Sequence, residues 1–455
     1  MDGKRHNEAA YSWRNLSVFI PKNPRALLSI FKSLKYKNFA IYFVGMFFSL
    51  IGSWIQQVAM GWLIYNITDS VFILSLSVFL SQIPVLFFTP FAGVVADRFE
   101  RKYIMMATQS SMMVLSFVLA ALTLSGHISI GAILFLSFVG GVIFSFDAPA
   151  RQSFYSKLVP PRDQTNAIAL NSTVINASRF LGPAIGGVMI AAVGEGYCFL
   201  LNAFCYLAIL LSLYLINVST VEKHKSNGAL AEIVEGFSYI RHMRPIRMVL
   251  SMLAVFSFFG VPFAMLMPAF AKGDLGGGSQ TLGNLMSFVG GGALVAALYL
   301  AARKSVLGIG RVIVCSCVIF GVALVAISFV REEVLAYVIC VPIGFGMVAV
   351  SASCNTMLQS LVEESKRGRV MSVFTMVFFG IPPLGSIVQG WVSSYTGLPA
   401  VTVFGGIVCV ITAFAFESGR KKVSMQARKI YAEKGLIMPE MAQALNSVSV
   451  GKPRG

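Results

Sequence analysis

The sequence contains few charged residues. Only 12% of its 455 residues are Asp, Glu, Lys or Arg, whereas 56% are hydrophobic. A soluble globular protein carries about 25% charged residues, so this chain lacks the charge to cover a water-facing surface. Its apolar residues instead form runs of roughly 20, the length of a helix that crosses the ~30 Å hydrocarbon layer of a bilayer. The sequence therefore predicts an all-α polytopic membrane protein.

Motifs for catalysis, metal binding and nucleotide binding are also missing. The seven cysteines lie inside apolar runs without the spacing of a metal site, so we expect small buried hydrophobic residues. No phosphate-binding G-x-x-x-x-G-K-S/T loop occurs, which argues against an ATP-driven pump. No grouping of His, Cys and Ser indicates an active site. We expect a protein that is not an enzyme and uses no cofactor or metal.

The apolar runs predict twelve transmembrane helices in two pseudo-symmetric halves of six. The longest polar connection follows the sixth run and separates the halves. The expected units are an N-terminal segment at 1–37 (an interfacial helix or a solvated tail), a first half at 38–216, a central loop at 217–247, a second half at 248–417 and a tail at 418–455. The expected spans are 38–65, 71–95, 103–125, 128–148, 166–193, 197–216, 248–271, 279–302, 312–330, 334–357, 370–393 and 399–416.

The net charge of +17 follows this topology. If the N-terminus lies inside, all but three of the 36 lysines and arginines fall in inner segments, the exceptions being Arg179, Lys272 and Arg331. The positive-inside rule therefore predicts that both termini are cytoplasmic. The basic balance thus indicates contact with a lipid bilayer and no nucleic-acid partner.

The densest charge cluster lies at 93–102, between the second and third runs. Gly93, Asp97, Arg98, Arg101 and Lys102 resemble the G-x-x-x-D-R-x-x-R-K loop of the major facilitator superfamily. The resemblance implies two six-helix halves that move a small molecule by alternating access.

The resemblance also implies a conformational latch at the inner side. Asp97 would lie against the N-terminus of helix eleven, near 368–370, where a helix dipole favours an anion. Arg101 would pair with an acid at the end of helix four, where Asp147 stands. The alternative is that these charges only set the topology.

Helix five carries a second family signature. Gly182, Pro183, Gly186 and Gly187 resemble the G-P-x-x-G-G end of a motif found in exporters of the superfamily, with Ser178 in place of its first glycine. This resemblance favours efflux over uptake.

Polar residues inside the spans are candidates for substrate contacts. Arg179 is the one charge near a membrane centre, where insertion costs roughly 2.5–3.5 kcal/mol, so it needs a cavity or a partner. It either attracts an anionic group of the cargo or has a structural role. The other candidates, which serve either the cargo or helix packing, are Ser172, Asn176, Gln56, Gln57, Asn284 and Asn355.

The cargo is predicted only by resemblance. The runs 51–59, 146–152 and 166–171 look like the bacterial branch that includes enterobactin exporters and macrolide-efflux proteins. This implies a monomeric carrier of a bacterial inner membrane that exports a siderophore or related metabolite. The alternatives are a multidrug or macrolide efflux carrier, a lipid or lysophospholipid flippase, and a non-transporting sensor. The resemblance also implies that a proton gradient drives transport. No carboxylate is predicted deep in a helix, so Asp97, Asp147 or Glu195 would have to carry the proton.

Overall fold

The computed structural model describes residues 32–216, 238–303, 307–363 and 366–433, without some side chains such as those of Asp97 and 421–433. Within these residues, twelve helices are long and apolar enough to cross a membrane, which confirms the predicted all-α fold and span count. The first half contains η2 (Lys32–Lys35), α2 (Lys37–Thr68), α3 (Val71–Arg98), α4 (Arg101–Leu124), α5 (Ile130–Phe154), η3 (Tyr155–Leu158), η4 (Pro161–Asp163), α6 (Gln164–Val193) and α7 (Glu195–Leu215). The second contains α9 (Arg244–Phe259), α10 (Pro262–Met265), α11 (Met267–Ala269), η5 (Phe270–Asp274), α12 (Ser279–Ala301), α13 (Ile309–Ile327), α14 (Glu333–Leu361), α15 (Arg367–Thr396) and α16 (Leu398–Glu433).

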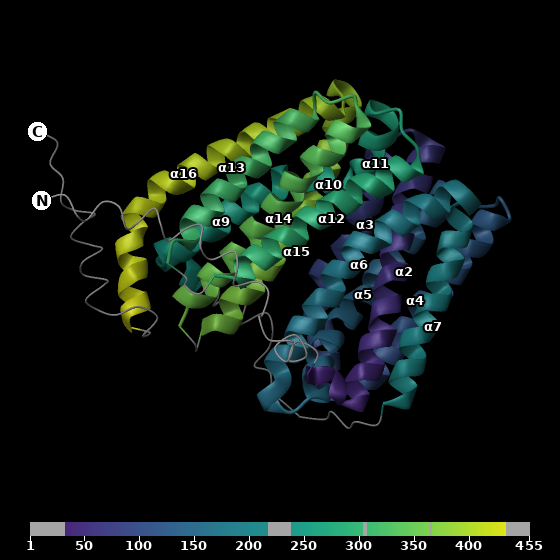
Figure 1. Ribbon diagram of the computed structural model, residues 1–455, viewed down its shortest axis with the longest axis horizontal. Helices are drawn as coiled ribbons and strands as arrows, with labels where there is room; N and C mark the ends of the chain where they lie inside the picture. Colours follow the sequence, from purple (N-terminus) through teal and green to yellow (C-terminus); the bar gives the residue numbers. More distant parts are fainter. Residues whose placement is uncertain (1–31, 217–237, 304–306, 364–365, 434–455) are drawn as a thin grey trace, which may run out of the picture.

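The two halves form two groups of helices that converge at one end and separate at the other (Figure 1). We call the end where α2 finishes and α12 begins the closed end. The opposite end, where α3 finishes and α6 begins, is the splayed end. By the charge rule, the splayed end is predicted to face the cytoplasm.

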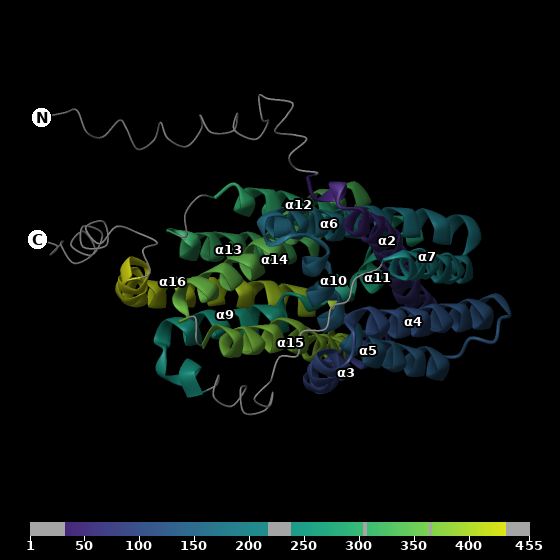
Figure 2. The same cartoon turned by 90° about the horizontal axis from the view of Figure 1, so that it is seen from below.

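Two helix pairs join the halves. Helix α6 packs against α12, and α3 packs against α15. Figure 2 shows these two seams on opposite edges of the molecule. The molecule is thus joined along both edges.

The seventh span differs from the single helix expected at 248–271. It is divided into α9, α10, α11 and the π-helical η5. Pro262 and Pro268 each start a new short helix, because proline cannot donate the backbone hydrogen bond that would continue the preceding one. The two prolines were the signal for this division in the sequence, but the prediction used hydropathy alone, which is uniform along the segment.

The last span is longer than expected, since α16 continues past 416 to Glu433. The added segment contains three Lys, two Arg, two Ala and two Glu residues, which are good helix formers. The predicted interfacial helix in 1–37 lies mostly outside the described residues, which include only Lys32–Lys35 as a 3-10 helix and the start of α2. Most of the predicted central loop also lies outside them.

Candidate transport site

A cavity of about 390 Å³ lies within the first half and reaches the second. Helices α2, α3, α4, α5 and α7 line it, together with α10, α11 and α12. Its polar lining includes Gln56, Gln57, Gln82, Asn202 and Tyr206, and none of the described residues that line it is charged. Of the predicted substrate residues, the structure places Gln56 and Gln57 here.

Hydrogen bonds orient part of this lining. The Oε1 atom of Gln56 accepts bonds from Ser116 Oγ and from Asn202 Nδ2, both at 2.7 Å. Tyr206 Oη lies 3.4 Å from Ser53 Oγ. The amides at one wall are therefore held by α4 and α7, which the sequence interpretation had not connected to the site.

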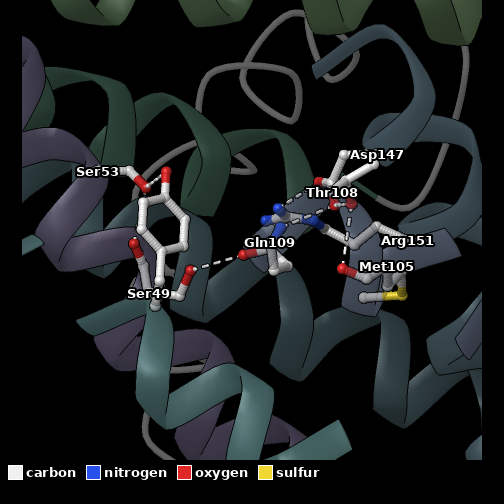
Figure 3. A network of polar contacts seen from close by, with 8 residues as sticks. Ser49, Ser53, Met105, Thr108, Gln109, Asp147 and Arg151 are labelled. Carbon is white, nitrogen blue, oxygen red and sulfur yellow. Dashed lines mark hydrogen bonds and ion pairs between the residues drawn. The ribbon is translucent and has the colours of Figure 1, made fainter. Parts of the chain in front are cut away.

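A buried acid lies beside the cavity, toward the splayed end. The carboxylate of Asp147 is 1% exposed and accepts hydrogen bonds from Thr108 Oγ1 at 2.8 Å and Gln109 Nε2 at 2.7 Å. It also forms an ion pair with Arg151, four residues later on α5 (Figure 3). Gln109 Oε1 in turn accepts from Ser49 Oγ at 3.5 Å. Polar contacts thus extend from the acid to α2, the helix that carries Gln56.

The predicted pair between Arg101 and Asp147 is not formed. Arg151 is the partner of Asp147 instead, and one terminal nitrogen of Arg101 is buried without a hydrogen-bond partner. The i,i+4 spacing of Asp147 and Arg151 on one helix explains the choice, because such side chains share a face. Since α5 continues to Phe154, Asp147 lies inside the helix and not at its predicted end at 148.

The other latch residues take different positions. Arg98 is exposed, and Lys102 Nζ donates to the carbonyl oxygen of Ile216 at 2.6 Å, tying α4 to the end of α7. Gly93 and Asp97 lie on α3, but the Asp97 side chain is outside the described part. The latch role stays a prediction.

The helix-five motif packs against two partners. A Cβ atom added to Gly182 would lie 2.4 Å from Trp54 Cβ, and one added to Gly186 would lie 3.3 Å from Ile55 Cα, both on α2. Gly187 faces the other half, where an added Cβ would lie 2.7 Å from the Ser279 carbonyl oxygen on α12. Its small residues allow close helix contact both inside the first half and across the seam.

Pro183 also lies at the seam. A Cβ added to Gly283 on α12 would lie 2.6 Å from the Pro183 carbonyl oxygen. All four residues of the exporter-type motif therefore lie at close helix contacts, and a role of the motif in export stays a prediction.

Arg179 is placed away from the cavity lining. Its guanidinium lies over the Trp54 ring, 5.4 Å from the ring centroid, and its Nε atom is buried without a hydrogen-bond partner. Among the described residues, it forms no ion pair. The cation–π contact supports the structural interpretation, while the unpartnered Nε leaves one group for an anion.

The remaining candidates lie outside the cavity lining: Ser172, Asn176, Asn284 and Asn355. The three asparagines have local contacts. Asn176 Nδ2 donates to the Ser172 carbonyl oxygen at 2.8 Å on the same helix. Asn355 Oδ1 accepts from Gln359 Nε2 at 2.9 Å, and Asn284 lies within hydrogen-bonding reach of Tyr337. Their amides take part in local contacts.

An ion pair crosses the halves at the closed end. Lys272 Nζ, in η5, lies 2.7 Å from the Asp69 carboxylate, which follows α2. Arg331 lies 3.7 Å from Asp274 within the second half. Burial raises the pKa of Asp274, and the charge of Arg331 opposes that rise. Lys272 and Arg331, two of the three cations that departed from the inner charge pattern, therefore have acidic partners at this end.

A second acid is buried at the splayed end, in the connection between α5 and α6. The Asp163 side chain is 2% exposed and contacts Lys32 Nζ at 2.8 Å, Tyr36 Oη at 2.6 Å and Lys35 Nζ at 3.5 Å. The hydrogen bonds from Lys32 and then Tyr36 lower the pKa of Asp163 to about 2. This cluster fixes η2 to the first half.

Two six-helix halves with a cavity between them are the architecture of solved transporters that this fold resembles. The family model described as a transmembrane secretion effector matches residues 28–450, so the chain belongs to this family.

Individual relatives are distant. The chain is 25% identical over 390 residues to the staphyloferrin A transporter of Staphylococcus aureus, covering 85% of this chain and 97% of that one. It is 24% identical over 361 residues to the multidrug efflux pump Tap of Mycolicibacterium fortuitum, covering 77% and 87%.

Solved structures share the fold. A POT family transporter in complex with 5-aminolevulinic acid gives a TM-score of 0.68 at 12% identity, covering 85% of this chain and 96% of that one. The nucleoside transporter NupG gives 0.65 at 16% identity, covering 85% and 98%.

Proposed function

We propose that this protein exports a small amphiphilic molecule from a bacterial cell by alternating access. The observation that carries the proposal is a cavity next to two halves that converge at the closed end and separate at the other. In a transporter with two halves, rocking about such a site exposes it alternately to the two sides. With the splayed end toward the cytoplasm, this arrangement is the one that would receive cargo from inside.

The proposed cargo is a siderophore or a related metabolite. The relative that transports staphyloferrin A supports this choice, and it matches most of both chains. Multidrug efflux is the second candidate, supported by the likeness to Tap. The proposed location is the bacterial cytoplasmic membrane, with both termini inside and a monomer as the working unit.

We further propose that proton movement drives export, with Asp147 as the proton-carrying acid. Its carboxylate is buried and bonded to Gln109, whose contacts lead through Ser49 to α2. Protonation would release Arg151 from the pair and change the charge next to the cavity. A proton site linked in this way to the substrate site provides coupling.

Comparative mass spectrometry of medium and cytosol tests the export proposal. The strains are a deletion strain, the same strain with the native protein restored, and the same strain with Asp97→Asn. We expect one metabolite to accumulate inside the deletion and Asp97→Asn strains and to leave the restored strain. If siderophore release is normal and only drug sensitivity changes, the drug efflux alternative replaces the siderophore.

Transport into inside-out vesicles tests the coupling proposal. Asp147→Asn removes the titrating group. Asp163→Asn is the matched control, because the buried Asp163 carboxylate contacts Lys32, Lys35 and Tyr36 and is not bonded to Gln109. We expect a protonophore to stop uptake by the native protein and by Asp163→Asn, while Asp147→Asn shows no response to the pH gradient. A normal response in Asp147→Asn rejects Asp147 as the carrier.

A further inference from the structure

The polar lining of the cavity offers amide groups that the protein does not use. Gln57 on α2 and Gln82 on α3 both line the cavity, and neither has a hydrogen-bond partner among the described residues. The Oδ1 atom of Asn202, on α7, is buried without a partner. Gln57 is exposed and Gln82 is half-buried, so both amides can form hydrogen bonds with a molecule in the cavity, whereas Asn202 is fully buried and cannot.

The same cavity offers no net charge to a ligand. None of the described lining residues is charged. Asp147 and Arg151 neutralise each other, and Arg179 lies over Trp54, which is also outside the lining. Moving a charged group from water into such a site without a counter-charge is costly, whereas a neutral group that forms hydrogen bonds with amides pays much less.

The apolar lining is adaptable. Four methionines contribute to it: Met60, Met112, Met265 and Met286. Methionine side chains are flexible and polarizable, and they fit apolar groups of different shapes. The last two come from the second half, so a molecule held here touches both halves.

From these three observations we infer that the cavity binds an uncharged molecule, with an apolar body against the methionines and amide or hydroxyl groups against Gln57 and Gln82. The cavity therefore selects against a cargo that places a carboxylate there. This inference rests on the proposed function for its biological meaning and adds the substrate class. Among the proposed cargoes, it favours neutral amphiphiles over anionic chelators.

Equilibrium binding to the purified full-length protein in lipid nanodiscs tests the inference without requiring transport. The probes are radiolabelled chloramphenicol, which is neutral with an amide, hydroxyls and an aromatic ring, and its succinate ester, which adds one carboxylate. We expect chloramphenicol to bind at least about tenfold more tightly than the ester, because the ester must bury its charge.

Substitutions in the cavity test whether chloramphenicol binds there. Gln57→Leu and Gln82→Leu should each weaken chloramphenicol binding roughly two- to tenfold through the loss of one hydrogen bond. Gln359→Leu is the matched control, since Gln359 is exposed on α14 outside the cavity lining, and it should leave binding unchanged. Gln57→Lys adds a cation and should shift the preference toward the ester. Thermal unfolding of each variant verifies that it is folded.

The inference is overturned if the ester binds as tightly as chloramphenicol and Arg179→Gln removes that binding, since the cargo would then be held through its charge. Binding of neither probe to the folded protein also overturns it. If the probes bind as expected but no strain exports any compound, the site stands and the proposed export function fails.

Discussion

The closed end and the splayed end hold their polar groups in different ways. At the closed end, the Lys272–Asp69 pair joins the two halves, and Gly187 brings α6 against α12. At the splayed end, Asp147 pairs with Arg151, and Asp163 pairs with Lys32, all within the first half. The acids at the splayed end are buried, whereas Asp69 is 70% exposed.

The buried and the exposed ion pairs have different structural roles. A buried pair inside one half is costly to break while both of its groups are charged, so it holds that half together as a unit until its acid takes up a proton. An exposed pair across the halves contributes little stability and is easily exchanged for water. The ion pair that must break in alternating access, Lys272–Asp69, is thus weaker than the pairs inside the first half. The predictions below test this difference between the two ends.

The largest effect is expected from Asp147→Leu. It leaves Arg151 buried without its counter-charge, which costs about 3–5 kcal/mol. Thermal unfolding in detergent measures the loss. The double variant Asp147→Leu with Arg151→Met removes both charges and should recover most of the stability. If the single and double variants are equally destabilised, the pair is not the cause.

A smaller effect is expected from Gly187→Leu. The new side chain would clash with Ser279 on α12, and overpacking of this kind costs about 1–3 kcal/mol, roughly a five- to 150-fold change in the closed population. We expect slower export in vesicles with little change in unfolding temperature. Gly131→Leu is the control, because a Cβ at Gly131 meets nothing within 4 Å. Equal rates in the two variants would argue against a tight seam.

The exchange of Asp69 and Lys272 should have a small effect. Asp69→Lys alone places two cations together and favours separation at the closed end, while Asp69→Lys with Lys272→Asp restores the pair. Because the pair is exposed, each change should alter stability by only about 0–1 kcal/mol. Spin-label distances across the closed end measure the separation. A double variant that stays as separated as the single one would contradict the pairing.

The last prediction concerns the acid dependence of stability that Asp163 contributes. Its pKa is lowered to about 2 in the folded protein, against about 3.9 for an unperturbed aspartate. The stabilisation is therefore complete above about pH 4 and is lost as the pH falls toward 2. The unfolding temperature of the native protein, compared with Asp163→Asn between pH 6 and 3, measures this part. An identical pH dependence in both would show that Asp163 does not contribute.

Hydropathy and charge predicted the twelve spans, because span length and apolar composition are local properties. The site was predicted only in part. Gln56 and Gln57 were found from their position in an apolar helix, but Gln82 and Asn202 look identical in the sequence to packing amides. The Asp147–Arg151 pair had a signal in its four-residue spacing, although the family resemblance pointed to Arg101.

The contacts of Asp163 and of Lys272 join residues far apart in the chain, and no local sequence pattern predicts them. Charges outside the spans indicate a side of the membrane, but not a partner. Partner choice depends on how the helices pack.

The interrupted seventh span forms part of the cavity wall with two short helical segments. Ala264, Met265 and Pro268 line the cavity from the short segments α10 and α11, and Lys272 follows within η5. The stretch that touches the cargo is therefore continuous with the one that holds the cross-half ion pair. In the proposed transport cycle, a cargo that displaced this wall would also move Lys272, which would link occupancy of the cavity to the breaking of the Lys272–Asp69 pair.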